Sequence, residues 1–286
     1  MALSTTVTPV SLHPDDNGAL LIATASKISV ALQTTTVINT GSTEFSIPLI
    51  TGEVGTRWYA EGSDITLADA ATAEEVVRPR KTAGLSQISS ELANDSSPEA
   101  SKVVGESIAR SIATTIDAAF FGSAAGTGVP PKGLGAFTDA ALTTITTAAG
   151  VTTWADLDPF TAAIFGVEAV GGSLTSFVAN PADAEKLAKL KKQSGNIEPL
   201  LSPDATSPTT RRLAGLPLFT SSAVTVGTVY GLDISRVYTV MRSDATVEVD
   251  RSVYFGSDSV AVRCIARLAF GYPHAKSIAR IKLATV

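Results

Sequence analysis

The amino-acid sequence predicts an α+β fold, and three observations carry that prediction. Residues 40–87 read as a long two-stranded ribbon with almost no large apolar residues between its strands. A strongly periodic helix follows over about 97–121, and the last third of the chain is rich in β-branched strand patterns. A length of 286 residues allows one large domain or two modest ones.

The first 39 residues lack a clear core pattern. Serine and threonine dominate, and only the stretch Gly18–Gln33 is apolar enough for a short helix. We therefore expect an arm that packs on another part of the assembly or of the chain.

The ribbon begins with alternating apolar residues over Phe45–Leu49, the period expected of a half-buried strand. Pro48 cannot donate to a ladder and favours an edge. The second strand is predicted over 75–80, continuing through 83–89. An isolated two-stranded ribbon is marginally stable in water, so this one needs another surface, which we expect to be another chain.

The connection inside the ribbon contains Gly52, Gly55 and Gly62, and we expect these glycines to act as flexible hinges. It also carries the adjacent aromatic residues Trp58 and Tyr59.

The helix has the clearest signals in the chain. Asn94–Ser97 offers N-cap oxygens, Pro98 suits the first helical position and Glu99 suits the helix dipole. Apolar residues recur every four positions from Val104 to Phe120, which makes one buried stripe, and Gly122 ends the helix.

The remaining elements alternate between helix and strand and then become strands only. A Gly- and Pro-rich turn is predicted over 123–135 and a Thr-rich strand over 141–147. Helices are predicted over 153–169 and 181–192, and strands over 174–179, 213–221, 237–241, 247–249, 260–270 and 275–283, with a loop over 194–210.

Composition argues against a tight nucleic-acid binder. Charged residues make up only 17% of the chain, against roughly 25% in typical soluble domains, and the net charge is −5. A specific nucleic-acid binder usually carries a basic patch, so only diffuse contact with a polyanion is expected. A low-charge, Thr-rich surface suits a subunit that buries much of its exterior, and composition alone leaves a neutral secreted β-protein open.

Compartment signals point to a cytoplasm. The single cysteine, Cys264, lies in an apolar strand pattern and is expected to be a buried structural thiol. The N-terminal residues do not form a signal peptide, and no stretch reaches the ~18 apolar residues of a membrane span.

No catalytic, metal or cofactor site is expected. His13 and His274 do not stand at ligand-like spacing with cysteine or acidic residues. Glu74 and Glu75, like Asp15 and Asp16, are sequence neighbours, and neighbours on a strand face opposite sides.

The glycine-rich turn does not have the order of a phosphate loop. It reads Lys132-Gly133-Leu134 and follows a helix instead of preceding one, so a structural turn is expected. The basic runs 78–81 and 186–192 are short, and solvated faces or salt bridges explain them.

Four sequence motifs occur in the order of a known family. They are Trp58-Tyr59-Ala60-Glu61-Gly62, Ser89-Ser90-Glu91-Leu92-Ala93-Asn94-Asp95-Ser96, Phe120-Phe121-Gly122 with Pro131-Lys132-Gly133-Leu134, and Leu213-Ala214-Gly215-Leu216-Pro217-Leu218. Over about 40–281 the chain resembles the major capsid proteins of tailed bacteriophages, which have the Hong Kong 97-type fold. The resemblance implies an N-terminal arm (1–39), an extended loop (40–87), a peripheral domain with its spine helix (88–150 and 236–286) and an axial domain (151–235).

The resemblance also implies function and partners. Hexamers and pentamers would close into an icosahedral shell around double-stranded DNA, in a virion assembled in the host bacterial cytoplasm. A portal would be a partner, and separate scaffolding or decoration proteins are further candidates. The alternatives are an encapsulin-like nanocompartment shell, which shares the fold but loads protein, and an enzyme or carbohydrate-binding β-domain.

The expected intersubunit contacts lie in the extended loop. They are Glu53, Arg57, Trp58, Tyr59 and Glu61. Some family members cross-link covalently through a lysine in this loop, but the chain has no lysine between Thr40 and Pro79, and only Lys81 lies at the base. No covalent cross-link is therefore expected. Because the extended loop begins within about 40 residues of Met1, we expect a separate scaffold, or none, in place of a long N-terminal scaffolding extension.

Overall fold

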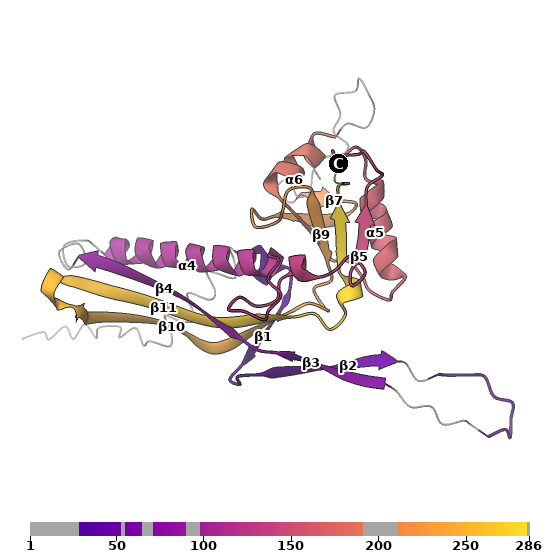
Figure 1. Cartoon of the computed structure of the whole chain (residues 1–286), viewed down its shortest axis with the longest axis horizontal. Coiled ribbons are helices and arrows are strands. Elements are labelled where there is room, and N and C mark those ends of the chain that lie inside the picture. The colour runs from indigo at the N-terminus through magenta and orange to yellow at the C-terminus, as the bar shows by residue number, and fades with distance from the viewer. Residues whose placement is uncertain (1–28, 53–54, 65–70, 90–97, 191–210, 285–286) are drawn as a thin grey trace, which may run out of the picture.

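The structure, a computed structural model, describes residues 29–52, 55–64, 71–89, 98–190 and 211–284. It has three parts: an elongated sheet with a long helix on one face, a compact α/β unit at one end, and a thin hairpin that projects from the base (Figure 1). The predicted N-cap residues 94–97, most of the arm and the loop after 190 lie outside the described residues.

The elongated sheet has the strand order β1-β10-β11-β4. Its strands are β1 (Thr36–Thr40), β10 (Tyr238–Tyr254), β11 (Ser259–Gly271) and β4 (Arg80–Ser89). β1 runs parallel to β10, and the other pairs are antiparallel. The sheet thus joins segments from both ends of the chain, as Figure 1 shows by the indigo and yellow strands lying side by side.

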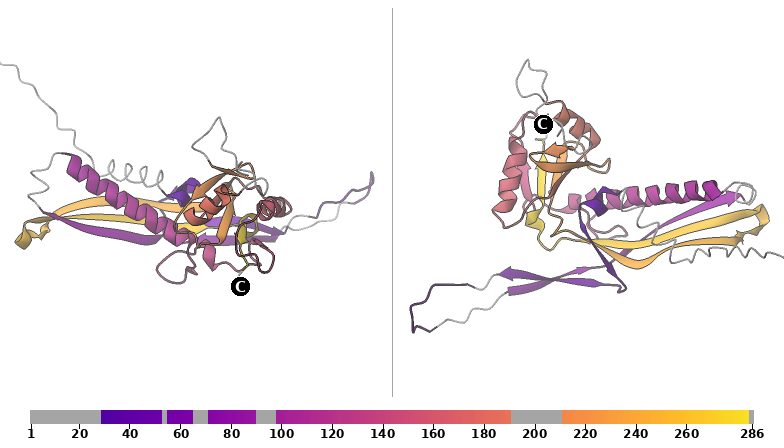
Figure 2. Two further views of the ribbon diagram at one scale, coloured as in Figure 1. Left: turned by 90° about the horizontal axis from the view of Figure 1, so that it is seen from above. Right: turned by 180° about the vertical axis from the view of Figure 1, so that it is seen from behind.

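The predicted helix is α4 (Pro98–Phe121), which lies over one face of this sheet (Figure 2). Its buried stripe is confirmed toward the C-terminal end, where Ile116 and Phe120 are fully buried. Phe120 stacks edge-on against Phe270 of β11 with 4.9 Å between ring centroids. Earlier in the helix, Ile108 and Ile112 are only partly buried.

The compact unit is built on a six-stranded sheet of order β5-β12-β9-β6-β8-β7. Its elements are β5 (Thr143–Thr146), α5 (Asp158–Glu168), β6 (Ser176–Ala179), α6 (Pro181–Ala188), β7 (Arg212–Leu213), β8 (Leu216–Thr220), β9 (Thr228–Leu232) and β12 (Ala279–Lys282). Short 3₁₀ turns are η1 (Leu134–Ala136), η2 (Phe255–Ser257) and η3 (Ala275–Ser277).

The six-stranded sheet is buried on both faces. Along β6, Phe177 and Ala179 pack with Phe160 of α5 in one core, whereas Val178 packs with Phe121 of α4 in the other. This alternation follows the two-residue period of a strand. It makes the end of α4 part of the join between the two sheets.

Two strand assignments from the sequence need correction. The segment expected to continue the ribbon through 83–89 is instead β4, which pairs with β11 in the elongated sheet. The last strand, β12, was grouped with the peripheral C-terminal strands, but it pairs with β5 and β9 in the compact unit. Strand partners lie far away in the chain here, and periodicity alone does not specify them.

The Gly/Pro turn is structural, as predicted. After the helix ends at Phe121, the backbone folds back so that Gly135 N donates to Gly122 O at 2.9 Å. A Cβ at Gly133 would lie 2.2 Å from Gly122 O, so this close approach requires glycine.

Candidate intersubunit interface

The projecting hairpin consists of β2 (Phe45–Gly52) and β3 (Ala71–Val77), paired antiparallel. Only its base has a core. There Phe45 and Ile47 pack against Val77, Val240 and Ala269. Beyond the base the strands have no cover from the described chain, and Ile50 is exposed.

Polar contacts close the base of the hairpin and fix it to the sheet. Between the two strand ends of the hairpin itself, the Arg78 side chain donates to the Glu44 carboxylate at 2.8 Å. The Glu75 carboxylate accepts from the backbone N of Tyr272 at 3.0 Å, directly after β11. Burial raises the pKa of Glu75, although this hydrogen bond and the Lys132 ammonium act in the opposite direction.

The tip of the hairpin carries an aromatic residue that is fully exposed to solvent. Trp58 is 104% exposed, and Arg57 and Glu61 beside it are also exposed. Tyr59 retains 37% exposure. Exposed tryptophan costs free energy because its large apolar surface stays in water, so the tip is suited to bury that ring against a partner.

The three predicted hinge glycines, Gly52, Gly55 and Gly62, differ in backbone conformation and surroundings. Gly62 has φ 82° inside a turn closed by Ser63 N donating to Ala60 O at 3.1 Å, a position that favours glycine. Gly52 is the last residue of β2, next to a register shift, and a Cβ at Gly55 would meet open space. Glu53, the fifth predicted contact residue, lies outside the described residues.

Sequence reasoning missed the buried carboxylate of Asp117 on α4. It accepts from Ser29 Oγ at 2.6 Å, from Ala31 N at 3.0 Å and from Val30 N at 3.2 Å at the start of α2 (Val30–Gln33). It also accepts from Ser221 Oγ at 3.2 Å, after β8. A negative charge near the C-terminus of a helix is unfavourable because it opposes the helix dipole. The position of Asp117 in the last turns of α4 was therefore a sequence signal that its carboxylate has hydrogen-bond donors elsewhere in the chain.

The cysteine and the two histidines are the other side chains that the sequence offers for chemistry. Cys264 is buried in β11, as predicted, and burial raises the pKa of its thiol. His274 lies in a turn, and His13 falls outside the described residues. Within the described part of the chain, no three His, Cys, Asp or Glu side chains gather as a metal site, and no helix is long and apolar enough to cross a membrane.

This arrangement, a helix-covered sheet with an α/β unit and a projecting hairpin, is that of phage capsid proteins with the Hong Kong 97-type fold. A structure from Mycobacterium phage Bobi matches with a TM-score of 0.73 at 19% identity, covering 90% of this chain and 91% of that one. The capsid of a native GTA particle matches with a TM-score of 0.68 at 21% identity, covering 100% and 95%. None of the curated proteins matches the chain in sequence.

The sequence itself gives the family. The model of the phage capsid family matches residues 14–283. The chain belongs to the phage capsid family, and it is a capsid shell protein, a component of the virion and of a homo-oligomeric assembly.

Proposed function

We propose that this chain self-assembles as hexamers and pentamers into an icosahedral shell that encloses double-stranded DNA, and that it works without catalysis. The observation that carries the proposal is the hairpin, which projects away from the rest of the molecule (Figure 1) and holds the fully exposed Trp58 between its two strands. Family membership supports a shell built from repeated subunits.

The extended hairpin would hold the neighbouring subunit by packing and charge pairs. The segment from Thr40 to Pro79 contains no lysine, so an isopeptide link from the hairpin is not expected. Burying one aromatic side chain contributes about 1.5–3 kcal/mol. Repeated over many symmetric contacts, such weak interfaces make a durable shell.

Assembly in the bacterial cytoplasm, a portal, and scaffolding or decoration proteins belong to the same proposal. The net charge of −5 supports only diffuse contact with the packaged DNA, through local patches and not through the subunit as a whole.

Expression of the chain followed by electron microscopy and nuclease treatment tests the proposal. We expect closed particles, and, with the other phage proteins present, nuclease-protected double-stranded DNA. Particles that contain a dedicated protein cargo instead of DNA would identify an encapsulin-like shell. A chain that remains monomeric in the presence of its phage partners would contradict assembly.

The tryptophan tip gives a sharper test. Replacing Trp58 with alanine should lower the assembled fraction while the isolated subunit keeps its thermal stability, because the side chain is fully exposed and does not pack against the described part of the subunit. Val226→Ala, which truncates an exposed apolar residue of the compact unit, is the matched control. Normal particle yield and heat resistance in Trp58→Ala would rule out the tip as a main contact.

A further inference from the structure

The base of the hairpin turns one face toward the body, and a single carboxylate interrupts the apolar side chains of that face. Phe45 pairs with Val77 across the two strands, and Ile47 pairs with Glu75, so these four side chains lie on the same side of the hairpin. The three apolar ones pack against β10 and β11 in one small cluster. Because partial burial of a carboxylate costs free energy, the contact that Glu75 makes has to offset that cost.

The partner of this carboxylate is a donor that belongs to the body. Strand β11 ends at the preceding residue, and the backbone N of Tyr272 donates to the two carboxylate oxygens of Glu75 at 3.0 and 3.2 Å. The buried Tyr272 ring packs against Phe120 and Phe137, with 6.1 and 5.1 Å between ring centroids. Its hydroxyl donates to Lys132 O at 3.1 Å. The donor is therefore held by the main core and not by the hairpin.

Two different non-covalent contacts thus join the hairpin to the body among the described residues. The apolar cluster acts as a pivot, because packing between apolar side chains is non-directional. The hydrogen bond from Tyr272 N to Glu75 is directional, because N–H···O bonds weaken steeply as they bend. A pivot and a directional contact beside it together fix the angle at which the hairpin leaves the body.

A hollow beside this hydrogen bond leaves room for the hairpin to turn. It has a volume of about 240 Å³ and lies between β3, the start of β4, the end of β11 and the turn after α4. Glu75, Lys132 and Phe270 are among the residues that line it. Close packing on this side of the base therefore does not fix the angle of the hairpin.

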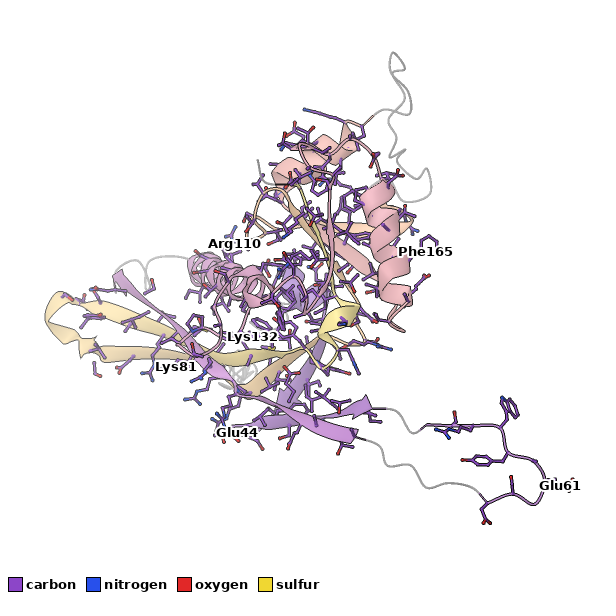
Figure 3. The ribbon with its side chains drawn as sticks, turned by 45° about the vertical axis from the view of Figure 1, so that its right-hand side comes forward. Glu44, Glu61, Lys81, Arg110, Lys132 and Phe165 are labelled. Carbon is purple, nitrogen blue, oxygen red and sulfur yellow. The ribbon has the colours of Figure 1, made fainter. Side chains whose placement is uncertain are left out.

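A change in that angle is amplified along the hairpin. In Figure 3, Glu44 marks the base and Glu61 the tip, which projects away from the body. A small rotation about the base therefore becomes a large displacement at the tip, where Trp58 is exposed. Identical subunits make identical contacts only if the hairpin leaves the body in the same direction in each copy.

We infer that Glu75 is a positioning residue, which sets the direction of the hairpin through its hydrogen bond with Tyr272 N and thereby controls assembly. This inference rests on the proposed function and adds to it the residue that prepares the hairpin for assembly. A carboxylate oxygen and an amide oxygen can both accept from the backbone N–H, so the role belongs to the acceptor and not to the charge.

Double electron–electron resonance on the unassembled subunit tests the direction itself. Spin labels are attached at Thr72→Cys, on β3 beyond Glu75, and at Thr114→Cys on α4, since both positions are exposed and Cys264 is buried. We expect one narrow distribution of label distances when Glu75 is present. In Glu75→Ala the fraction of subunits outside that distribution should rise by about tenfold, because hydrogen bonds to charged acceptors are among the stronger ones.

Glu75→Gln and Glu74→Ala are the matched controls. The first keeps an acceptor for Tyr272 N, and the second removes the exposed carboxylate next to Glu75 in sequence, so both should keep the narrow distribution. If Glu75→Ala does not fold, Glu75→Leu makes the same comparison, because it removes the acceptor and fills the space. A narrow distribution in the variant without an acceptor, or a broad one in Glu75→Gln, overturns the positioning role.

Particle yield connects the direction of the hairpin to assembly. Glu75→Ala should lower the yield several-fold, whereas Glu75→Gln and Glu74→Ala should retain it. A lower melting temperature of Glu75→Ala with an unchanged distance distribution would indicate a purely structural role, and a normal yield with a broad distribution would overturn the link to assembly. If the natural chain forms no particles with its phage partners, the proposed function fails, while the distances in the unassembled subunit still decide whether Glu75 positions the hairpin.

Discussion

Among single residues, Asp117 of α4 links more segments of the chain than any sequence pattern around it indicates. Its carboxylate receives hydrogen bonds from Ser29, from the first turn of α2 and from Ser221. Three segments separated by about a hundred residues therefore meet at one side chain. The arm, the long helix and the compact unit are joined there.

Asp117→Ala should destabilise the subunit by about 2–4 kcal/mol, because buried donors lose their acceptor. Asp117→Asn should cost less, since the remaining oxygen still accepts from Ser29 or Ala31. Asp156→Ala, which removes only an exposed contact to Asp158 N, serves as the control. Thermal or denaturant unfolding of the isolated subunit measures the difference, and equal stability of Asp117→Ala and Asp156→Ala would contradict this role.

Glu75 makes the hairpin base sensitive to pH. Burial raises its pKa above the ordinary value of 4.5, so the folded subunit binds this proton more tightly than the unfolded chain does. The stabilising contribution is present below pH 4.5 and is lost as pH rises through the higher pKa of the folded state.

Glu75→Gln should flatten the decrease in subunit stability across that window and raise stability above it. The amide oxygen can still accept from Tyr272 N, so the hydrogen bond at the base survives. Unfolding curves at a series of pH values between about 4 and 7 make the comparison, with the exposed neighbour Glu74→Gln as control. An identical pH profile for Glu75→Gln and the natural chain would contradict the assignment.

At the scale of elements, the turn after α4 depends on contact between backbones. The Cβ of an alanine at Gly133 would lie 2.5 Å from Ala119 O as well as against Gly122 O. Neither neighbour is a flexible side chain that can move aside. Gly133→Ala should therefore cost about 1–3 kcal/mol of stability.

Gly128→Ala is the control for this turn. Its added Cβ would meet only Pro130 Cδ at 3.9 Å, an ordinary contact. Unfolding of the two variants should differ clearly, and wild-type stability in Gly133→Ala would show that the turn relaxes without cost.

The elements themselves could be predicted where local signals are strong. The sequence predicts helix α4 (Pro98–Phe121) over about 97–121. Apolar residues recur every four positions along it, a proline marks its first turn, and a glycine follows its last residue. Strand β1 was missed because Thr36–Thr40 has no distinctive pattern, and its order comes from pairing with β10, some two hundred residues later. Such partners are set by the fold and not by local sequence.

The same reasoning explains which half of the candidate site could be found. Trp58 stood out in the sequence because it is a large aromatic residue within a glycine-rich, polar stretch. The partners of Asp117 could not be found, since Ser29, Asp117 and Ser221 lie in three distant segments that only the fold brings together.

At the scale of the whole molecule, the hairpin is nearly independent of the body that carries it. The two large cores lie in the body, and among the described residues the hairpin contacts the body through a small apolar cluster and the Glu75–Tyr272 hydrogen bond. Stability of the subunit and its capacity to assemble are therefore separable properties.

Excision of residues 53–70, with β2 and β3 rejoined by a two-residue Asn-Gly turn, tests that separation. The body should fold with unchanged secondary structure and nearly the same melting temperature, because none of the excised residues contributes to the described cores. Assembly should be lost, because the tip that we propose to contact a neighbouring subunit is gone. Circular dichroism and sedimentation velocity measure the two properties separately. A shortened chain that still closes into particles would show that contacts of the body alone suffice, and one that fails to fold would show that the ribbon stabilises its own subunit.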